Sequence, residues 1–197
     1  ITNLPWRLRE ADLARAACME QLELVNDFCV LIYGLPHFDS HQQVILQKGR
    51  QDKGPLAILG AGTGLGMARG LQSEQGLMAL ASEGGHREFA PRNEAEWELA
   101  SWLKQDLGVS RLSIERIVSG TGLGHVAHWL LQKPDAAMHP LRSVAEAWRR
   151  NSSNDLPAQV SVAAQGGDPL MQRALQLWLE AYGSAAGDLA LQELCTG

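Results

Sequence analysis

Three groups of polar residues have the types and spacing that catalysis or ligand binding requires. Asn26-Asp27 stands between a short alternating segment and an apolar run, Glu83-Gly84-Gly85-His86 places an acid and an imidazole around two glycines, and Glu115 follows later. An aspartate at a strand end can act as a general base, because the carboxyl ends of strands in open α/β sheets form the binding crevice. Two glycines permit a tight bend that aims Glu83 and His86 into one pocket, where they suit vicinal sugar hydroxyls.

Each of these groups also has a purely structural interpretation. Asp27 can be the N-cap of the helix that follows it. Glu83 and His86 can be an exposed acid and a hydrogen-bonded histidine in a loop. Glu115 can be a solvated acid in a short helix. The residues alone leave these alternatives open.

The segment Leu56–Gly66 combines an apolar run with glycine at every second position, at residues 60, 62, 64 and 66. Glycine weakens a strand, so four glycines on one pleat face indicate that something approaches the backbone closely. A phosphate is the commonest such group. The alternative is a β-hairpin with bulges. Since the residues after Gly66 alternate like a strand, the glycines are expected on a strand–turn–strand unit.

Several other site classes are excluded by spacing. A P-loop requires Gly-Lys-Ser/Thr, but no lysine lies between Lys53 and Lys104. The third glycine of a Rossmann fingerprint is missing, and no Gly-x-Ser-x-Gly elbow surrounds Ser82. His125 and His128 are three residues apart and can share a helix face, yet no acid or cysteine stands at ligand spacing. No metal site is therefore expected.

Composition narrows the class of protein further. A net charge of -5 argues against binding to a nucleic-acid backbone, and no apolar run is long enough to cross a membrane. Three scattered cysteines without a CxxC pair favour a reducing, cytoplasmic setting. The chain opens on Ile1 rather than methionine and ends at Gly197. Both ends suggest an internal fragment of a longer protein.

The hydrophobic periodicity predicts a mixed α/β fold. Helices are expected over Leu8–Gln21, Phe28–Leu35 (buried), Asn93–Leu107, Ser113–Ser119, Leu123–Gln132, Leu141–Arg150, Pro157–Gln165 and from Asp168 to Leu194. Strands are expected over Leu22–Val25, His41–Gln47, Leu56–Leu59, Met67–Leu71 and Leu77–Ala81. A hinge is expected at Pro36–Ser40.

In order and separation, these motifs resemble the bacterial glucokinase family of ATP-dependent, actin-like sugar kinases. The resemblance runs along the whole chain, from Thr2-Asn3 with Trp6 through Leu24-Val25-Asn26-Asp27-Phe28 and Gly60-Ala61-Gly62-Thr63-Gly64-Leu65-Gly66. It continues through Glu83-Gly84-Gly85-His86, Phe89-Ala90-Pro91 and Glu115-Arg116-Ile117-Val118-Ser119-Gly120. No zinc motif of the cysteine-rich cousins follows His86, so no structural zinc is expected.

The resemblance implies roles for individual residues. Asp27 matches the catalytic base, and Asn26 its neighbour that holds a sugar hydroxyl. Glu83, His86 and Glu115 match the other glucose ligands. Gly60, Gly62, Thr63 and Gly64 match the second phosphate loop. The implied substrates are glucose and ATP with Mg²⁺, in a cytoplasmic protein that can form a homodimer.

The same resemblance implies an actin-like fold in which residues 1–37 belong to a small domain and residues 38–197 to a large one. The family's first phosphate loop and its adenosine-binding segment have no counterpart in this chain. A non-catalytic sugar-binding or sensing protein on the same fold, or an inactive fragment, is the alternative.

Overall fold

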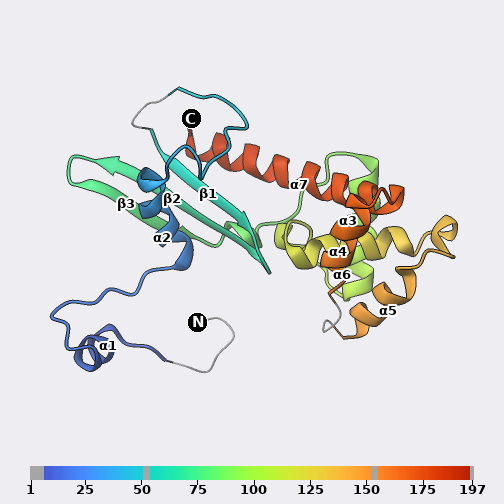
Figure 1. Ribbon diagram of the computed structural model, residues 1–197, viewed down its shortest axis with the longest axis horizontal. Coiled ribbons are helices and arrows are strands. Elements are labelled where there is room, and N and C mark those ends of the chain that lie inside the picture. Colours follow the sequence, from blue (N-terminus) through green and yellow to red (C-terminus); the bar gives the residue numbers. More distant parts are fainter. Residues whose placement is uncertain (1–6, 51–53, 152–154, 196–197) are drawn as a thin grey trace.

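The computed structural model describes residues 7–50, 54–151 and 155–195, which form a mixed α/β structure (Figure 1). A three-stranded antiparallel sheet lies at one end and a group of helices at the other, and the helix α7 reaches from one to the other (Figure 1). The strands are β1 (Leu56–Ala61), β2 (Leu65–Ser73) and β3 (Gly76–Ser82). The α-helices are α1 (Glu10–Ala16), α2 (Asp27–Gly34), α3 (Glu94–Leu107), α4 (Gly120–Leu131), α5 (Arg142–Arg150), α6 (Leu156–Gln165) and α7 (Pro169–Glu193).

The glycine-spaced segment forms the hairpin of β1 and β2, in the sheet order β1-β2-β3. The predicted strand–turn–strand unit is thus confirmed. Gly60 pairs with Gly66, and Ala61 with Leu65 across the turn. Alternation along β2 turns Leu65 and Met67 toward the large helical core, while Ala68 joins the smaller core under α2.

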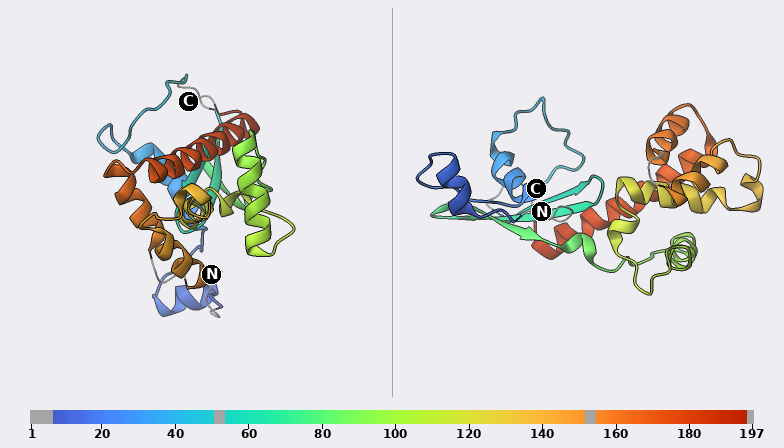
Figure 2. Two further views of the ribbon diagram at one scale, coloured as in Figure 1. Left: turned by 90° about the vertical axis from the view of Figure 1, so that its right-hand side faces the viewer. Right: turned by 90° about the horizontal axis from the view of Figure 1, so that it is seen from below.

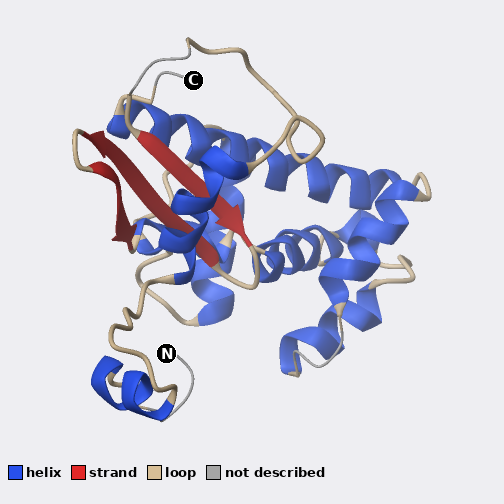
Figure 3. Cartoon of the chain, turned by 60° about the vertical axis from the view of Figure 1, so that its left-hand side comes forward, coloured by secondary structure: helices blue, strands red, loops and turns tan. Residues whose placement is uncertain are grey.

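The helix α2 covers one face of the sheet and α7 lies on the opposite side (Figure 2). Cys29 and Ile32 are the buried residues of α2, and they pack with Ala68. The hydroxyl of Tyr33 accepts a hydrogen bond from the backbone N–H of Ala79 at 3.2 Å. The sheet and α2 therefore form two layers that pack against each other (Figure 3).

The main core is helical and centres on α4, whose residues 122–131 are all buried. Against α4 pack α7, α6 and α5. Two aromatic side chains of α7 reach back toward the sheet and the start of α4. The indole of Trp178 donates to the carbonyl of Ser119 at 2.9 Å, and the Tyr182 hydroxyl donates to the carbonyl of Leu59 at 3.2 Å. These bonds fix the strand β1 and the first turn of α4 to one rigid helix.

The structure confirms two helix starts that were predicted from capping residues. Asn93 accepts from the N–H of Glu96 at 3.0 Å, and Asp168 accepts from the N–H of Met171 at 3.0 Å before the first-turn Pro169. Gly108 ends α3 in the left-handed region with a φ of 66°. These signals are local, because a cap needs only its own chain neighbours.

Two predicted strands are wrong. Residues 22–25 and 41–47 have no strand structure, and Val44, Ile45 and Leu46 are 84%, 68% and 95% exposed. A strand is stable when a neighbouring strand pairs its backbone groups, and the described part of the chain places none beside these segments. Apolar alternation alone does not supply that partner.

Three helix predictions hold only in part. The helix expected over Ser113–Ser119 is only the 3₁₀ turn Ile114–Arg116. The helix expected over 8–21 is only Glu10–Ala16, after which Cys18 adopts a left-handed φ of 53°. The apolar helix α2 forms as predicted, but it is not buried throughout, because Val30 and Leu31 are 50% and 43% exposed. A single sheet can cover only one side of it. The segment Pro36–Ser40, predicted as a hinge, begins in a short 3₁₀ turn, Leu35–His37, and continues as irregular chain.

No helix in the described ranges is both long and apolar enough to cross a membrane.

The cap of α7 gives a prediction about pH. Burial raises the pKa of the Asp168 carboxyl, but hydrogen bonds from the Met171 N–H and from His139 Nε2 at 2.9 Å outweigh it and lower the pKa below its ordinary value of 3.8. The stabilisation is present above that ordinary value and is lost as pH falls through the lowered one. Asp168→Asn keeps a capping oxygen and removes the charge.

We expect Asp168→Asn in the complete protein to lower the free energy of unfolding by about 1 kcal/mol or less at pH 7. The difference from the unmodified protein should shrink below about pH 4. Urea unfolding at both pH values measures it. If the variant loses more unfolding free energy at the lower pH than at pH 7, the pKa of Asp168 is not lowered in the folded protein.

Candidate active site

Glu83, His86 and Glu115 lie in a row, which is called the acidic row below. His86 Nε2 is 3.5 Å from Glu83 Oε2, and His86 Nδ1 is 3.9 Å from Glu115 Oε1. The side chains of Glu83 and His86 are 88% and 60% exposed, and that of Glu115 is 29% exposed. The expected bend that brings Glu83 and His86 together is present, and the structure adds Glu115 to them.

The bend is the short 3₁₀ helix Gly84–His86, and its glycines are there because of close packing on β2. A Cβ at Gly85 would lie 2.1 Å from the carbonyl oxygen of Leu65, and one at Gly84 would lie 2.6 Å from the sulfur of Met67. The N–H of His86 donates to the carbonyl of Glu83 at 2.9 Å. Packing, rather than flexibility, therefore explains both glycines.

Two arginines hold this bend in place. Arg87 donates to the carbonyl of Ala185 at 3.4 Å and pairs with Asp188 at 3.5 Å, both on α7. The guanidinium of Arg111 donates to the carbonyl of His86. Sequence reasoning missed both arginines, since their positions carry no motif and their partners are distant in the chain.

Glu115 is the residue that joins the acidic row to the hairpin. Its Oε2 accepts from the backbone N–H of Leu65 at 3.0 Å. A Cβ at Gly64 would lie 2.5 Å from the same oxygen. The structural alternative for Glu115, a solvated acid, is therefore wrong. Gly64 is needed because a carboxylate occupies the space beside it.

The hairpin turn lies against the N-terminus of α4. The carbonyl of Gly62 accepts from the N–H of Gly120 at 2.8 Å, and the hydroxyl of Thr121 donates to the carbonyl of Thr63 at 3.3 Å. A Cβ at Gly62 would have no atom within 4 Å, so that side of the turn is open. An open backbone turn beside a helix N-terminus suits an anionic group. Sequence reasoning missed Thr121.

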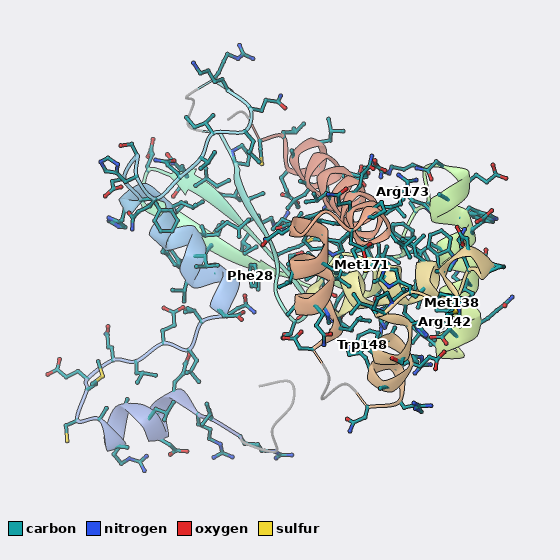
Figure 4. The ribbon with its side chains drawn as sticks, turned by 45° about the vertical axis from the view of Figure 1, so that its right-hand side comes forward. Phe28, Met138, Arg142, Trp148, Met171 and Arg173 are labelled. Atoms are coloured by element: carbon teal, nitrogen blue, oxygen red, sulfur yellow. The ribbon has the colours of Figure 1, made fainter. Side chains whose placement is uncertain are left out.

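The stem of the hairpin has a different neighbour from the expected phosphate. A Cβ at Gly60 would lie 2.8 Å from the Phe28 ring, and one at Gly66 would lie 1.9 Å from it. Phe28 extends from α2 toward the sheet (Figure 4). The four glycines thus meet three different surroundings: Phe28 at residues 60 and 66, Glu115 at residue 64, and open space at residue 62.

Asn26 and Asp27 lie at the start of α2. Asn26 is the N-cap, because its Oδ1 accepts from the N–H groups of Phe28 and Cys29 at 3.0 and 3.3 Å. Asp27 is the first helical residue, so the interpretation of Asp27 as the N-cap is wrong. Its Oδ1 accepts from the N–H of Phe28 at 3.0 Å, and the residue is exposed. Neither residue hydrogen-bonds to Glu83, His86 or Glu115 in the described chain.

His125 and His128 are buried in the helical core. His125 Nδ1 lies 2.9 Å from the carbonyl of Arg116, and His128 packs edge-on against Trp102. Burial lowers the pKa of both imidazoles. Among the described residues, no group of three histidine, cysteine or acidic side chains could hold a metal ion. The contacts give both histidines a structural role in the core.

The different surroundings of Gly62 and Gly64 give a test of the site's geometry. Gly64→Ala should displace Glu115 from the Leu65 N–H, because the new methyl group would overlap its carboxylate. Gly62→Ala is the matched control, since its methyl group meets open space. We expect faster hydrogen exchange at the Leu65 amide in Gly64→Ala only. Equal exchange in both variants would contradict the Glu115 contact.

Comparison with known proteins identifies the family of this chain. The model of the Glucokinase family matches residues 1–197. Glucokinases of Synechocystis sp. and Nostoc sp. are 40% and 37% identical over all of this chain, which spans 58% and 60% of their lengths.

Solved structures agree. A glucokinase from an Antarctic psychrotroph has a TM-score of 0.77 at 30% identity, covering 98% of this chain and 55% of its own. A Balamuthia mandrillaris glucokinase in complex with glucose has a TM-score of 0.56 at 25% identity, covering 78% of this chain and 39% of its own. The chain has the sugar-kinase fold and belongs to the glucokinase family.

Proposed function

We propose that the complete protein transfers the γ-phosphoryl group of ATP to the 6-hydroxyl of glucose. The observation that carries this proposal is the row of Glu83, His86 and Glu115, which Glu115 ties to the open glycine turn. It puts hydrogen-bonding groups for a polyhydroxyl ligand beside a backbone turn suited to phosphate. Family membership over residues 1–197 supports it.

The sugar would bind along the acidic row. Glu83 and Glu115 offer carboxylate acceptors, and His86 offers an imidazole between them. Asn26 uses its side-chain oxygen as the cap of α2, which leaves its NH₂ group to donate to a sugar hydroxyl. These four residues supply both donors and acceptors, as recognition of vicinal hydroxyls requires.

Asp27 would be the general base. One of its oxygens accepts from the Phe28 N–H, and the exposed carboxylate can still accept the proton of an alcohol. Proton acceptance in phosphoryl transfer depends on hydrogen-bond reach more than on an unusual pKa. Its position at the start of α2 would set where that proton is taken.

The open turn Gly62-Thr63-Gly64 would hold the transferred phosphate, with Gly60 shaping the stem through its contact with Phe28. Mg²⁺ would arrive with the nucleotide, bound through its phosphates. Bound in this way, Mg²⁺ would neutralise charge on the phosphates. The groups of this chain that would bind the phosphate are backbone N–H groups and the N-terminus of α4.

The wider setting is also part of the proposal. Residues 1–37 would belong to a small domain and residues 38–197 to a large one, and closure of one on the other would exclude water from the reacting groups. The enzyme would act in the cytoplasm and form a homodimer. Thr2, Asn3 and Trp6, which contribute to the resemblance, lie outside the described residues.

The base assignment predicts the behaviour of Asp27→Asn in the complete enzyme. The amide cannot accept the hydroxyl proton, so kcat should fall by at least about a hundredfold. The glucose Kd should change little, because an amide of the same shape remains. A coupled kinase assay and calorimetric titration with glucose separate these effects. A near-normal kcat would disprove the role of Asp27.

The sugar assignment predicts the opposite pattern for the acidic row. Glu83→Gln should raise the glucose KM about tenfold, because an amide oxygen accepts a weaker hydrogen bond than a carboxylate. His86→Ala should raise it about tenfold or more, because the imidazole contact, worth roughly 1–3 kcal/mol, is lost. A panel of hexoses epimeric at single positions, assayed with ATP, identifies the hydroxyl that each residue contacts. An unchanged glucose KM in both variants would place the sugar elsewhere.

A further inference from the structure

Phe28 makes the contact that connects the start of α2 to the hairpin. Its ring is half-buried between the helix and the cross-strand pair Gly60 and Gly66. A Cβ atom at Gly60 or Gly66 would lie 2.8 or 1.9 Å from a ring carbon. At either distance, the ring or the strand would have to move. A cross-strand pair of glycines under an aromatic ring allows closer approach than any other pair.

Different contacts hold the far end of α2 and its first turn. Ile32 packs so near Gly70 that a Cβ there would lie 2.7 Å away, and the hydroxyl of Tyr33 bonds to Ala79. At the first turn, Asn26 and Asp27 are exposed and the chain before them is irregular. The packed side chains of that turn are Phe28 and Cys29. Cys29 packs with Ala68 in the smaller core, whereas the ring of Phe28, one residue from Asp27, lies on the hairpin glycines.

The same hairpin holds Glu115. Leu65 donates its N–H to Glu115 at the turn end of β2, and Gly66, the next residue, lies under the Phe28 ring. A continuous path of close contacts therefore runs from Asp27 through Phe28 and the hairpin to Glu115. Gly60 and Gly66 permit this close approach, because no side chain lies between their backbone and the ring.

We propose that Phe28 is a positioning residue for phosphoryl transfer: its ring sets the distance between Asp27 and the hairpin that carries Glu115 and the open turn. This inference rests on the proposed function. A misplacement of about 1 Å in a reacting group can cost on the order of a hundredfold in rate. Loss of the ring should therefore lower kcat more than it weakens sugar binding, because Phe28 itself offers the sugar no polar contact.

The test uses steady-state kinetics of the complete enzyme. Phe28→Leu keeps an apolar side chain but removes the ring edge, and Gly66→Ala pushes the ring away with a methyl group. Each should lower kcat about tenfold to a hundredfold. The glucose KM should change less than about threefold. If Phe28→Leu fails to fold, the unbranched Phe28→Met replaces it.

Gly70→Ala is the matched control. It lies on the same strand and packs against the same helix, but at Ile32 rather than at Phe28. It should lower the melting temperature and leave kcat within about twofold. In the double variant of Phe28→Leu and Gly66→Ala, the melting temperature should fall by less than the sum of the two single decreases, since the smaller side chain makes room for the methyl group.

The outcomes separate the two proposals. If the unmodified enzyme does not phosphorylate glucose, the proposed function fails and this inference with it. If the unmodified enzyme is active but Phe28→Leu and Gly66→Ala lose no more kcat than Gly70→Ala, only the positioning role is overturned. A double variant whose melting temperature falls by the full sum of the two single decreases would overturn the direct contact between ring and glycine.

Discussion

The structure depends on how closely other groups approach the backbone of one hairpin. The Phe28 ring lies on Gly60 and Gly66, the Glu115 carboxylate lies beside Gly64, and the Gly84–His86 bend packs on the carbonyl of Leu65. A side chain at any of these glycines would separate the groups on its two sides. The hairpin therefore contacts α2, the acidic row and the first turn of α4, and it sets their positions relative to one another. Its glycine spacing reflects mostly protein contacts, and only Gly62 is left open.

Elements whose signals are local could be predicted from the sequence. Asn93 and Asp168 mark helix starts because a capping oxygen bonds to N–H groups two or three residues away. The hairpin follows from alternation and a glycine turn. Segments 22–25 and 41–47 show the limit of such reasoning, since alternation describes one face of a strand but not the strand that must pair with it.

The site could be predicted only in part, for the same reason. Resemblance identified Glu83, His86 and Glu115, and the structure brings them together. The supports of these residues come from far along the chain. Arg87 bonds to Ala185 on α7, 98 residues away. No spacing rule reveals such a contact, because it depends on where two separate elements pack.

The exposure of the acidic row determines how it can work. Glu83 and His86 are largely exposed, so their mutual attraction contributes at most about 1 kcal/mol. Backbone hydrogen bonds and the arginines hold the bend instead, which leaves the polar atoms of Glu83 and His86 available for a ligand. A bound sugar would displace water from these groups, and charge interactions strengthen where water is excluded.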